Sequence, residues 1–209
     1  MKKTLASILA LASMTLVALS ARAESLVAGS ADAGKAKAIT CTACHGPAGN
    51  SVNPLWPSIA GQGAPYLLAQ LQAFKTGTRS DPLMTSQAMM LSDQDMADLA
   101  VYFESLPSAA QAVADPALVD KAEALYRGGD VTDQISACIA CHGPTGRGNP
   151  AANYPALAGQ HSAYSAKQLR DYASGTRKSD GKTRMMRDIA ATLSEDEIVA
   201  LASYIQGLR

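Results

Sequence analysis

Apolar residues recur at helical spacing near the end of each half of the chain. The members of the two stripes are Met96, Leu99, Ala100, Phe103 and Leu106 in the first half and Ile198, Leu201, Ala202 and Ile205 in the second. Steps of three and four residues place such side chains on one face of an α-helix. Ser92 and Ser194 precede the stripes, each three residues before an acidic residue, which is the pattern of a helix N-cap. The sequence therefore predicts an amphipathic helix at both places.

A second, shorter helix is predicted upstream of each stripe. It covers residues 66–74, where three leucines form an apolar face, and its counterpart covers residues 164–172. No segment alternates between apolar and polar residues for long enough to indicate a strand. We therefore predict an all-α protein.

The two halves of the chain repeat one another. Three segments recur in the same order, beginning at Cys41 and Cys138, at Gly61 and Gly159, and at Leu91 and Leu193. The second pair shares 8 of 19 residues and the third pair 6 of 16, and the growing offset indicates insertions of one and four residues in the second copy. Self-similarity in a fixed order is typical of a duplicated domain. We predict domains at 24–108 and 117–209, joined by a linker at 109–116.

The first 23 residues are typical of an export signal peptide. Lys2 and Lys3 precede an apolar run, and small residues at Ala21 and Ala23 end it in the arrangement of a cleavage site. We predict cleavage after Ala23 and a location in the periplasm. An uncleaved membrane anchor is the alternative, although the apolar run is shorter than the ~20 residues that span a bilayer.

The charge balance bears on the kind of partner. Without its first 23 residues the chain has 15 basic and 18 acidic side chains. Proteins that bind nucleic acid concentrate basic residues in a patch or stripe. We therefore expect no nucleic acid partner.

All four cysteines of the chain lie in two Cys-x-x-Cys-His motifs, so none is left for disulfides elsewhere. Three chemistries use this spacing. A thioredoxin-like dithiol would accompany a β-α-β pattern, which is not visible here. A zinc site would have to gather ligands from two motifs that lie in separate repeats. Covalent attachment of haem needs only one motif for each group, and the motif occurs twice.

Helical geometry supports haem attachment. Residues three and four apart share a helix face, so Cys41, Cys44 and His45 point at one surface. The two thiols can form thioethers with haem, and the imidazole can bind the iron as its proximal ligand. Cys138, Cys141 and His142 repeat the arrangement. We therefore predict two covalently bound haem c groups, each serving as the core of a small domain that has few aromatic residues.

The second axial ligand is expected to be a methionine in both copies. Met84 lies eight residues before Ser92, and Met186 lies eight residues before Ser194. Met185 competes with Met186 in the second copy. His161 has no counterpart in the first copy, and we expect it to be an ordinary surface residue.

These features together resemble the class I cytochromes c, and the tandem arrangement with the motifs LAGQ and LSDQDMADLAVYF is similar to the dihaem cytochrome c4 family. The resemblance covers nearly all of the chain after the signal. It implies two all-α domains related by approximate two-fold symmetry, with haems that face one another across the interface. It also implies that a proline carbonyl accepts a hydrogen bond from each iron-bound histidine, a role that matches Pro57 and Pro155.

An electron carrier is the function that two six-coordinate irons indicate. The resemblance implies redox protein partners in the periplasm, with electrons passing from a quinol-oxidising complex toward a terminal oxidase, and peripheral association with the membrane is compatible with this. The alternative is a dihaem enzyme, such as a peroxidase or a sulfur-compound dehydrogenase, in which one iron has a labile ligand. Both copies keep a methionine at the same place, which favours the carrier.

The four-residue insertion lies in a basic segment near Met186. Its cations are Arg177, Lys178, Lys182, Arg184 and Arg187, whereas the first copy has only Lys75 and Arg79 nearby, together with Asp81. Positive charge favours reduced iron, although solvent and salt weaken the effect of exposed groups. We predict that the second haem has the higher reduction potential.

Overall fold

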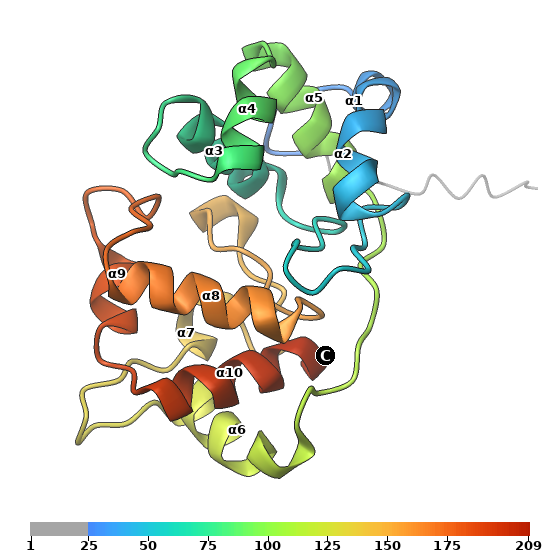
Figure 1. The fold of residues 1–209 in the computed structure, drawn as a ribbon. Helices are drawn as coiled ribbons and strands as arrows, with labels where there is room; N and C mark the ends of the chain where they lie inside the picture. The colour runs from blue at the N-terminus through green and yellow to red at the C-terminus, as the bar shows by residue number, and fades with distance from the viewer. Residues whose placement is uncertain (1–24) are drawn as a thin grey trace, which may run out of the picture.

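A computed structural model describes residues 25–209 and shows two helical domains joined by an extended segment (Figure 1). The predicted signal peptide, residues 1–23, lies outside the described residues. Among residues 25–209, no helix is long and apolar enough to cross a membrane.

The N-terminal domain packs two helices against a third. Its helices are α1 (Ala31–Lys37), α2 (Ile39–His45), α3 (Ala64–Lys75), α4 (Pro82–Met89) and α5 (Asp93–Glu104). Helices α1 and α3 contact α5, and Leu99 and Phe103 of α5 are buried with Ala38. Helix α1 comes close to α5 at Gly34, where a Cβ atom would lie 2.1 Å from the carbonyl oxygen of Asp98. The expected stripe of α5 therefore forms the centre of this domain.

The C-terminal domain repeats this plan around its last helix. Its elements are η1 (Pro116–Leu118), α6 (Val119–Gly128), α7 (Ile139–His142), η2 (Pro150–Ala152), α8 (Ser162–Ala173), α9 (Met185–Ala190) and α10 (Glu195–Gly207). Helix α10 packs against α6 and α8, and Leu201 and Ile205 of α10 are buried with Tyr126. The only β-pairings in residues 25–209 are two isolated bridges, so the all-α prediction is confirmed.

Both predicted N-caps are present as complete capping boxes. The side chain of Ser92 accepts from the backbone of Asp95, and that of Ser194 accepts from the backbone of Glu197. Each acid accepts a hydrogen bond from the backbone N–H of its serine in return. These reciprocal bonds satisfy amides that a helix start leaves without partners.

The segment between the domains is held to both of them. The backbone N–H of Ala109 donates to Asn50 of the N-terminal domain, and Gln111 donates to the carbonyl of Gly159 in the C-terminal domain. Farther along, the backbone N–H of Asp115 donates to the hydroxyl of Ser203. Residues 109–116, called the strap below, are therefore held against both domains and are not a free linker.

Candidate functional site

The first Cys-x-x-Cys-His motif lies on one short helix. Cys41 and Cys44 belong to α2, are not joined in a disulfide and are partly buried. His45 ends the helix and is buried. Its Nδ1 lies 2.7 Å from the carbonyl oxygen of Pro57. A carbonyl only accepts, so Nδ1 must carry the proton, and the lone pair of Nε2 remains free to bind a metal.

The second motif reaches the same arrangement through a shorter helix. Cys138 caps α7, which has a single turn, and Cys141 and His142 follow within that turn. The Nδ1 of His142 lies 2.9 Å from the carbonyl oxygen of Pro155. This proline is 13 residues after its histidine, against 12 in the first copy, because the one-residue insertion falls between them.

Burial shifts the pKa of the histidine and of the first cysteine in each motif. It lowers the pKa of His45 and of His142, although the hydrogen bond to the proline carbonyl opposes this shift. Burial also raises the pKa of the Cys41 thiol and raises that of Cys138 to about 11. Both imidazoles are therefore neutral at neutral pH, which is the form that binds iron.

The methionine side chains differ in how far they are exposed to solvent. Met84, in the first turn of α4, is half-buried, as are Met185 and Met186 at the start of α9. Met96 is fully buried in the core of its domain, as its place on the helix stripe indicates, whereas Met89 is 60% exposed. Met185 and Met186 are adjacent and similarly buried, so the choice between them stays a prediction.

His161 is not the surface residue that the sequence suggested. It is only 9% exposed, and its Nε2 lies 2.8 Å from the carbonyl oxygen of Ser51 in the other domain. The hydroxyl of Ser51 in turn donates to the carbonyl of Cys44, next to His45. The first copy has Gly63 at this position, and a Cβ there would lie 3.3 Å from Pro150 of the C-terminal domain. Both positions are therefore packed into the interface between the domains.

Two buried arginines meet at this interface. Arg79 is 9% exposed and Arg177 is 4% exposed. The guanidinium of Arg79 donates to the side chains of Gln70 at 2.9 Å, Tyr164 at 2.8 Å and Gln168 at 2.8 Å.

Arg177 makes the same contacts with the domains exchanged. Its guanidinium donates to Gln168 at 2.7 Å, Tyr66 at 2.7 Å and Gln70 at 2.8 Å. The exchange of partners is what a two-fold axis produces, because each surface then meets its own copy. The approximate two-fold relation is therefore visible in individual hydrogen bonds.

These two cations have neutral partners only. Among residues 25–209, no carboxylate forms an ion pair with Arg79 or Arg177. Burial raises the pKa of Tyr164, but the two neighbouring guanidiniums outweigh it and the net shift is downward. Buried charges ordinarily have a counter-charge, so the interface is suited to an anionic group.

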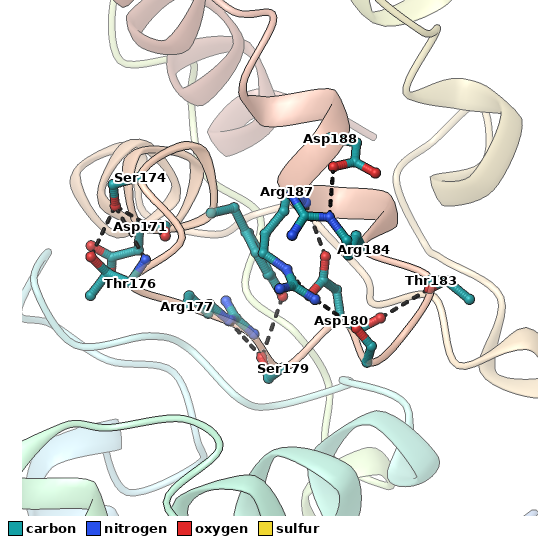
Figure 2. A network of polar contacts seen from close by, with 12 residues as sticks. Asp171, Ser174, Thr176, Arg177, Ser179, Asp180, Thr183, Arg184, Arg187 and Asp188 are labelled. Atoms are coloured by element: carbon teal, nitrogen blue, oxygen red, sulfur yellow. Dashed lines mark hydrogen bonds and ion pairs between the residues drawn. The ribbon is translucent and has the colours of Figure 1, made fainter.

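The basic segment near Met186 is partly neutralised (Figure 2). Arg187 pairs with Asp180 at 2.8 Å and Arg184 pairs with Asp188 at 3.2 Å. Arg177 belongs to the interface and matches Arg79 of the first copy. Lys178 and Lys182 are exposed. Apart from Arg177, whose counterpart in the first copy is Arg79, these two lysines are the cations of the segment with no carboxylate partner among the described residues. The charge difference between the copies is therefore smaller than the sequence indicated.

The residues present fit two haem groups. Each motif offers two unpaired thiols and a neutral histidine whose free nitrogen is Nε2. The methionine ligands stay a prediction, and Met84, Met185 and Met186 are half-buried. The buried arginines complement the carboxylates that haem carries. Within residues 25–209, no group of three His, Cys, Asp or Glu side chains gathers to hold a metal ion alone.

The interface residues were not recognised as such from the sequence, although a signal was present. Among the eight identical positions in the aligned segments from Gly61 and Gly159 are Gln62 and Gln160, Tyr66 and Tyr164, Gln70 and Gln168, and Arg79 and Arg177. Each of these residues forms a hydrogen bond with the other domain, whereas Thr78 and Thr176, which are also identical, are exposed.

Comparisons with known proteins agree with this geometry. The cytochrome c family matches residues 31–107 and again 124–209. Cytochrome c4 of Azotobacter vinelandii is 50% identical over 190 residues, which cover 87% of this chain and 90% of that protein. Cytochrome c4 of Pseudomonas aeruginosa is 51% identical over 181 residues, with the same coverage. The crystal structure of reduced recombinant cytochrome c4 from Pseudomonas stutzeri superposes with a TM-score of 0.85 at 48% identity, and the match covers 87% of this chain and all of that one.

Proposed function

The chain belongs to the cytochrome c family and within it to the dihaem cytochrome c4 proteins, and we propose that it is a periplasmic electron carrier and not an enzyme. It carries two covalently bound haem c groups and transfers electrons. Each haem, when bound, supplies a one-electron couple between ferric and ferrous iron. The observation that carries the proposal is that both domains present the same set of potential ligands.

The motif residues hold the cofactors. Cys41 and Cys44 form the thioethers in the first domain, and Cys138 and Cys141 form them in the second. His45 and His142 bind iron through Nε2, while the carbonyls of Pro57 and Pro155 fix each ring through its Nδ1. A carbonyl acceptor at this nitrogen sets the tautomer and raises the basicity of the ligand.

Met84 and Met186 would supply the second iron ligand in their domains. A thioether ligand raises the reduction potential of a c-type haem, and a filled sixth position leaves no site for substrate. Arg79 and Arg177, which are buried at the domain interface, would neutralise carboxylates that the haems bring there. Rigid ligands and a buried interface keep the structural change on electron transfer small.

The partners are redox proteins of the periplasm. A quinol-oxidising complex is the donor and a terminal oxidase is the acceptor, and the carrier reaches them by diffusion along the membrane surface. Export through cleavage after Ala23 delivers the chain to that compartment.

A redox titration of the mature protein tests this proposal. We expect two reversible one-electron steps for each chain. The Met186→Ala variant should lower the potential of one step by about 0.1 V or more, since axial ligands set haem potentials over a range of about 0.8 V. The Met84→Ala variant should lower the other step.

Met185→Ala is the matched control, because this residue is adjacent to Met186 and is also half-buried. It should leave both steps almost unchanged. A large shift of a reduction potential in Met185→Ala with none in Met186→Ala would reassign the ligand to Met185. If the reduced protein could not be reoxidised in two one-electron steps, the carrier function would be overturned.

A further inference from the structure

Two glutamines connect each domain to the proximal histidine of the other. The side chain of Gln62 holds Ala156, the residue after Pro155. The backbone N–H of Ala156 donates to Gln62 Oε1 at 2.8 Å, and Gln62 Nε2 donates to the carbonyl oxygen of Ala156 at 2.9 Å. This N–H and the carbonyl of Pro155 belong to one peptide group, and that carbonyl accepts from His142.

The same contact occurs with the domains exchanged. The backbone N–H of Ser58 donates to Gln160 Oε1 at 3.0 Å, and Gln160 Nε2 donates to the carbonyl oxygen of Ser58 at 2.8 Å. Ser58 follows Pro57, whose carbonyl accepts from His45. Both glutamines and both proline peptides are related by the approximate two-fold axis.

Each glutamine is also fixed in place. Gln62 is buried, and its Oε1 accepts from the backbone N–H of Gly63 at 3.0 Å. The Oε1 of Gln160 likewise accepts from the backbone N–H of His161 at 3.1 Å. The acceptor oxygens of Gln62 and Gln160 are therefore held just before α3 and α8, respectively, on the domain opposite to the peptide that they bind.

A peptide group transmits polarisation from its N–H to its carbonyl. When the N–H donates to an acceptor, the carbonyl oxygen becomes more negative and accepts more strongly, and hydrogen bonds in such a chain reinforce one another. A stronger acceptor at Nδ1 makes the imidazole more basic at Nε2. A more basic ligand stabilises ferric iron and lowers the reduction potential.

We propose that Gln62 and Gln160 are positioning residues that set the donor strength of the proximal histidine in the opposite domain. Gln62 acts on His142 through the Pro155–Ala156 peptide, and Gln160 acts on His45 through the Pro57–Ser58 peptide. The inference rests on the proposed roles of the two histidines as iron ligands. It couples the potential of each haem to the docking of the other domain.

A crossed pair of variants tests the inference in the mature, haem-loaded protein. Gln62→Met and Gln160→Met keep the length of the side chain but remove its acceptor. Potentials are read for each haem separately by NMR during a redox titration. Gln62→Met should raise the potential of the C-terminal haem, and Gln160→Met that of the N-terminal haem. The expected change in the reduction equilibrium is about threefold to tenfold, the latter equal to about 59 mV for one electron.

A second readout follows the histidine itself. In the reduced protein, the ¹⁵N shift of Nδ1 in His142 should move in Gln62→Met, and that of His45 should stay in place. Gln160→Met should show the reverse pattern.

Gln206→Met is the matched control. Gln206 also accepts from one backbone N–H, that of Ser162, and donates to one carbonyl, that of Ala112, but it does not contact a proline peptide. It should change neither potential. Equal shifts at both haems, a shift confined to the domain that carries the substitution, or no shift would each overturn the inference. A wild type without two histidine-ligated haems would instead overturn the proposed function.

Discussion

A neutral imidazole whose Nδ1 donates to a carbonyl has only Nε2 to offer a metal. His45 and His142 both meet this condition through backbone atoms of prolines 12 and 13 residues away. Backbone acceptors do not change with the residue type at the following positions, so the loops could diverge while the ligand geometry stayed the same. At this scale, one local hydrogen bond decides which nitrogen of each histidine is free to bind a metal.

Asp98 shows how the two copies differ at one position. It is buried in α5 and accepts from Lys37 of α1 at 2.8 Å and from the backbone N–H of Ser30 at 2.9 Å. The equivalent position in α10 is Ala200, which is also buried. The N-terminal domain therefore attaches its first helix through a charge that the second domain lacks.

This difference predicts an acid sensitivity of the N-terminal domain. The bond from Lys37 and the other hydrogen bonds lower the pKa of Asp98 from its ordinary value of 3.8 to about 2. A lowered folded-state pKa adds stability above the ordinary pKa, and that stability is lost as the pH falls through the folded one. We expect the urea midpoint of α1 and α5, followed by NMR, to decrease between about pH 4 and pH 2.

Asp98→Asn is the matched variant, because it keeps the shape and removes the charge. It should lower the midpoint at neutral pH and flatten the decrease between pH 4 and pH 2. An unchanged pH profile in this variant would assign the acid sensitivity to other groups.

At the scale of elements, the sequence predicted helix starts and apolar helix faces most readily. The two capping boxes and the apolar stripes of α5 and α10 are visible in the sequence because cap residues and helical spacing are local. Helices α4 and α1 were not predicted, although Asp81 before Pro82 and Ser30 before Asp32 are N-cap signals of the same kind. Their short lengths leave too few apolar positions to show a period.

The position of His161 could not be read from local pattern. A histidine with no counterpart in the other repeat has the appearance of a surface residue, and only the docking of the two domains brings it to Ser51. The acids Asp180 and Asp188 were overlooked for a related reason, because their pairing with Arg187 and Arg184 depends on the fold of the inserted loop.

The inserted loop retains a charge effect that can be measured. Lys178→Gln with Lys182→Gln removes two exposed cations near α9 and should lower the potential of the C-terminal haem. The shift should stay below about 59 mV, a tenfold change for one electron, and should shrink as salt is added, because salt screens exposed charges. Separate titrations at low and high ionic strength check both points.

The control for this prediction removes an ion pair whose net charge is zero. Arg184→Gln with Asp188→Asn deletes one cation and one anion that bind each other, so the potential should stay almost the same. The prediction that the second haem has the higher potential would be wrong if the N-terminal haem titrated at the higher value in the wild type.

The whole molecule is organised by its two-fold interface. The glutamines, tyrosines and arginines that meet there come from the same positions in both repeats, and each contact occurs twice. The interface excludes water from two buried cations and joins each proline peptide to the other domain. Duplication therefore supplied both a second haem and a surface that fits its own copy.

The asymmetric contacts of His161 and of the strap add to this interface. Neither is repeated by the two-fold axis, so they specify which domain contributes which surface.

Carbon monoxide binding by the fully reduced, mature protein tests the central claim most directly. Met186→Ala serves as the positive control, since one iron should then bind the gas. If both irons of the wild type are held by a histidine and a methionine, carbon monoxide should bind slowly and at low occupancy at either haem. Rapid, full-occupancy binding at one haem of the wild type would contradict the account and would indicate a dihaem enzyme with an open iron.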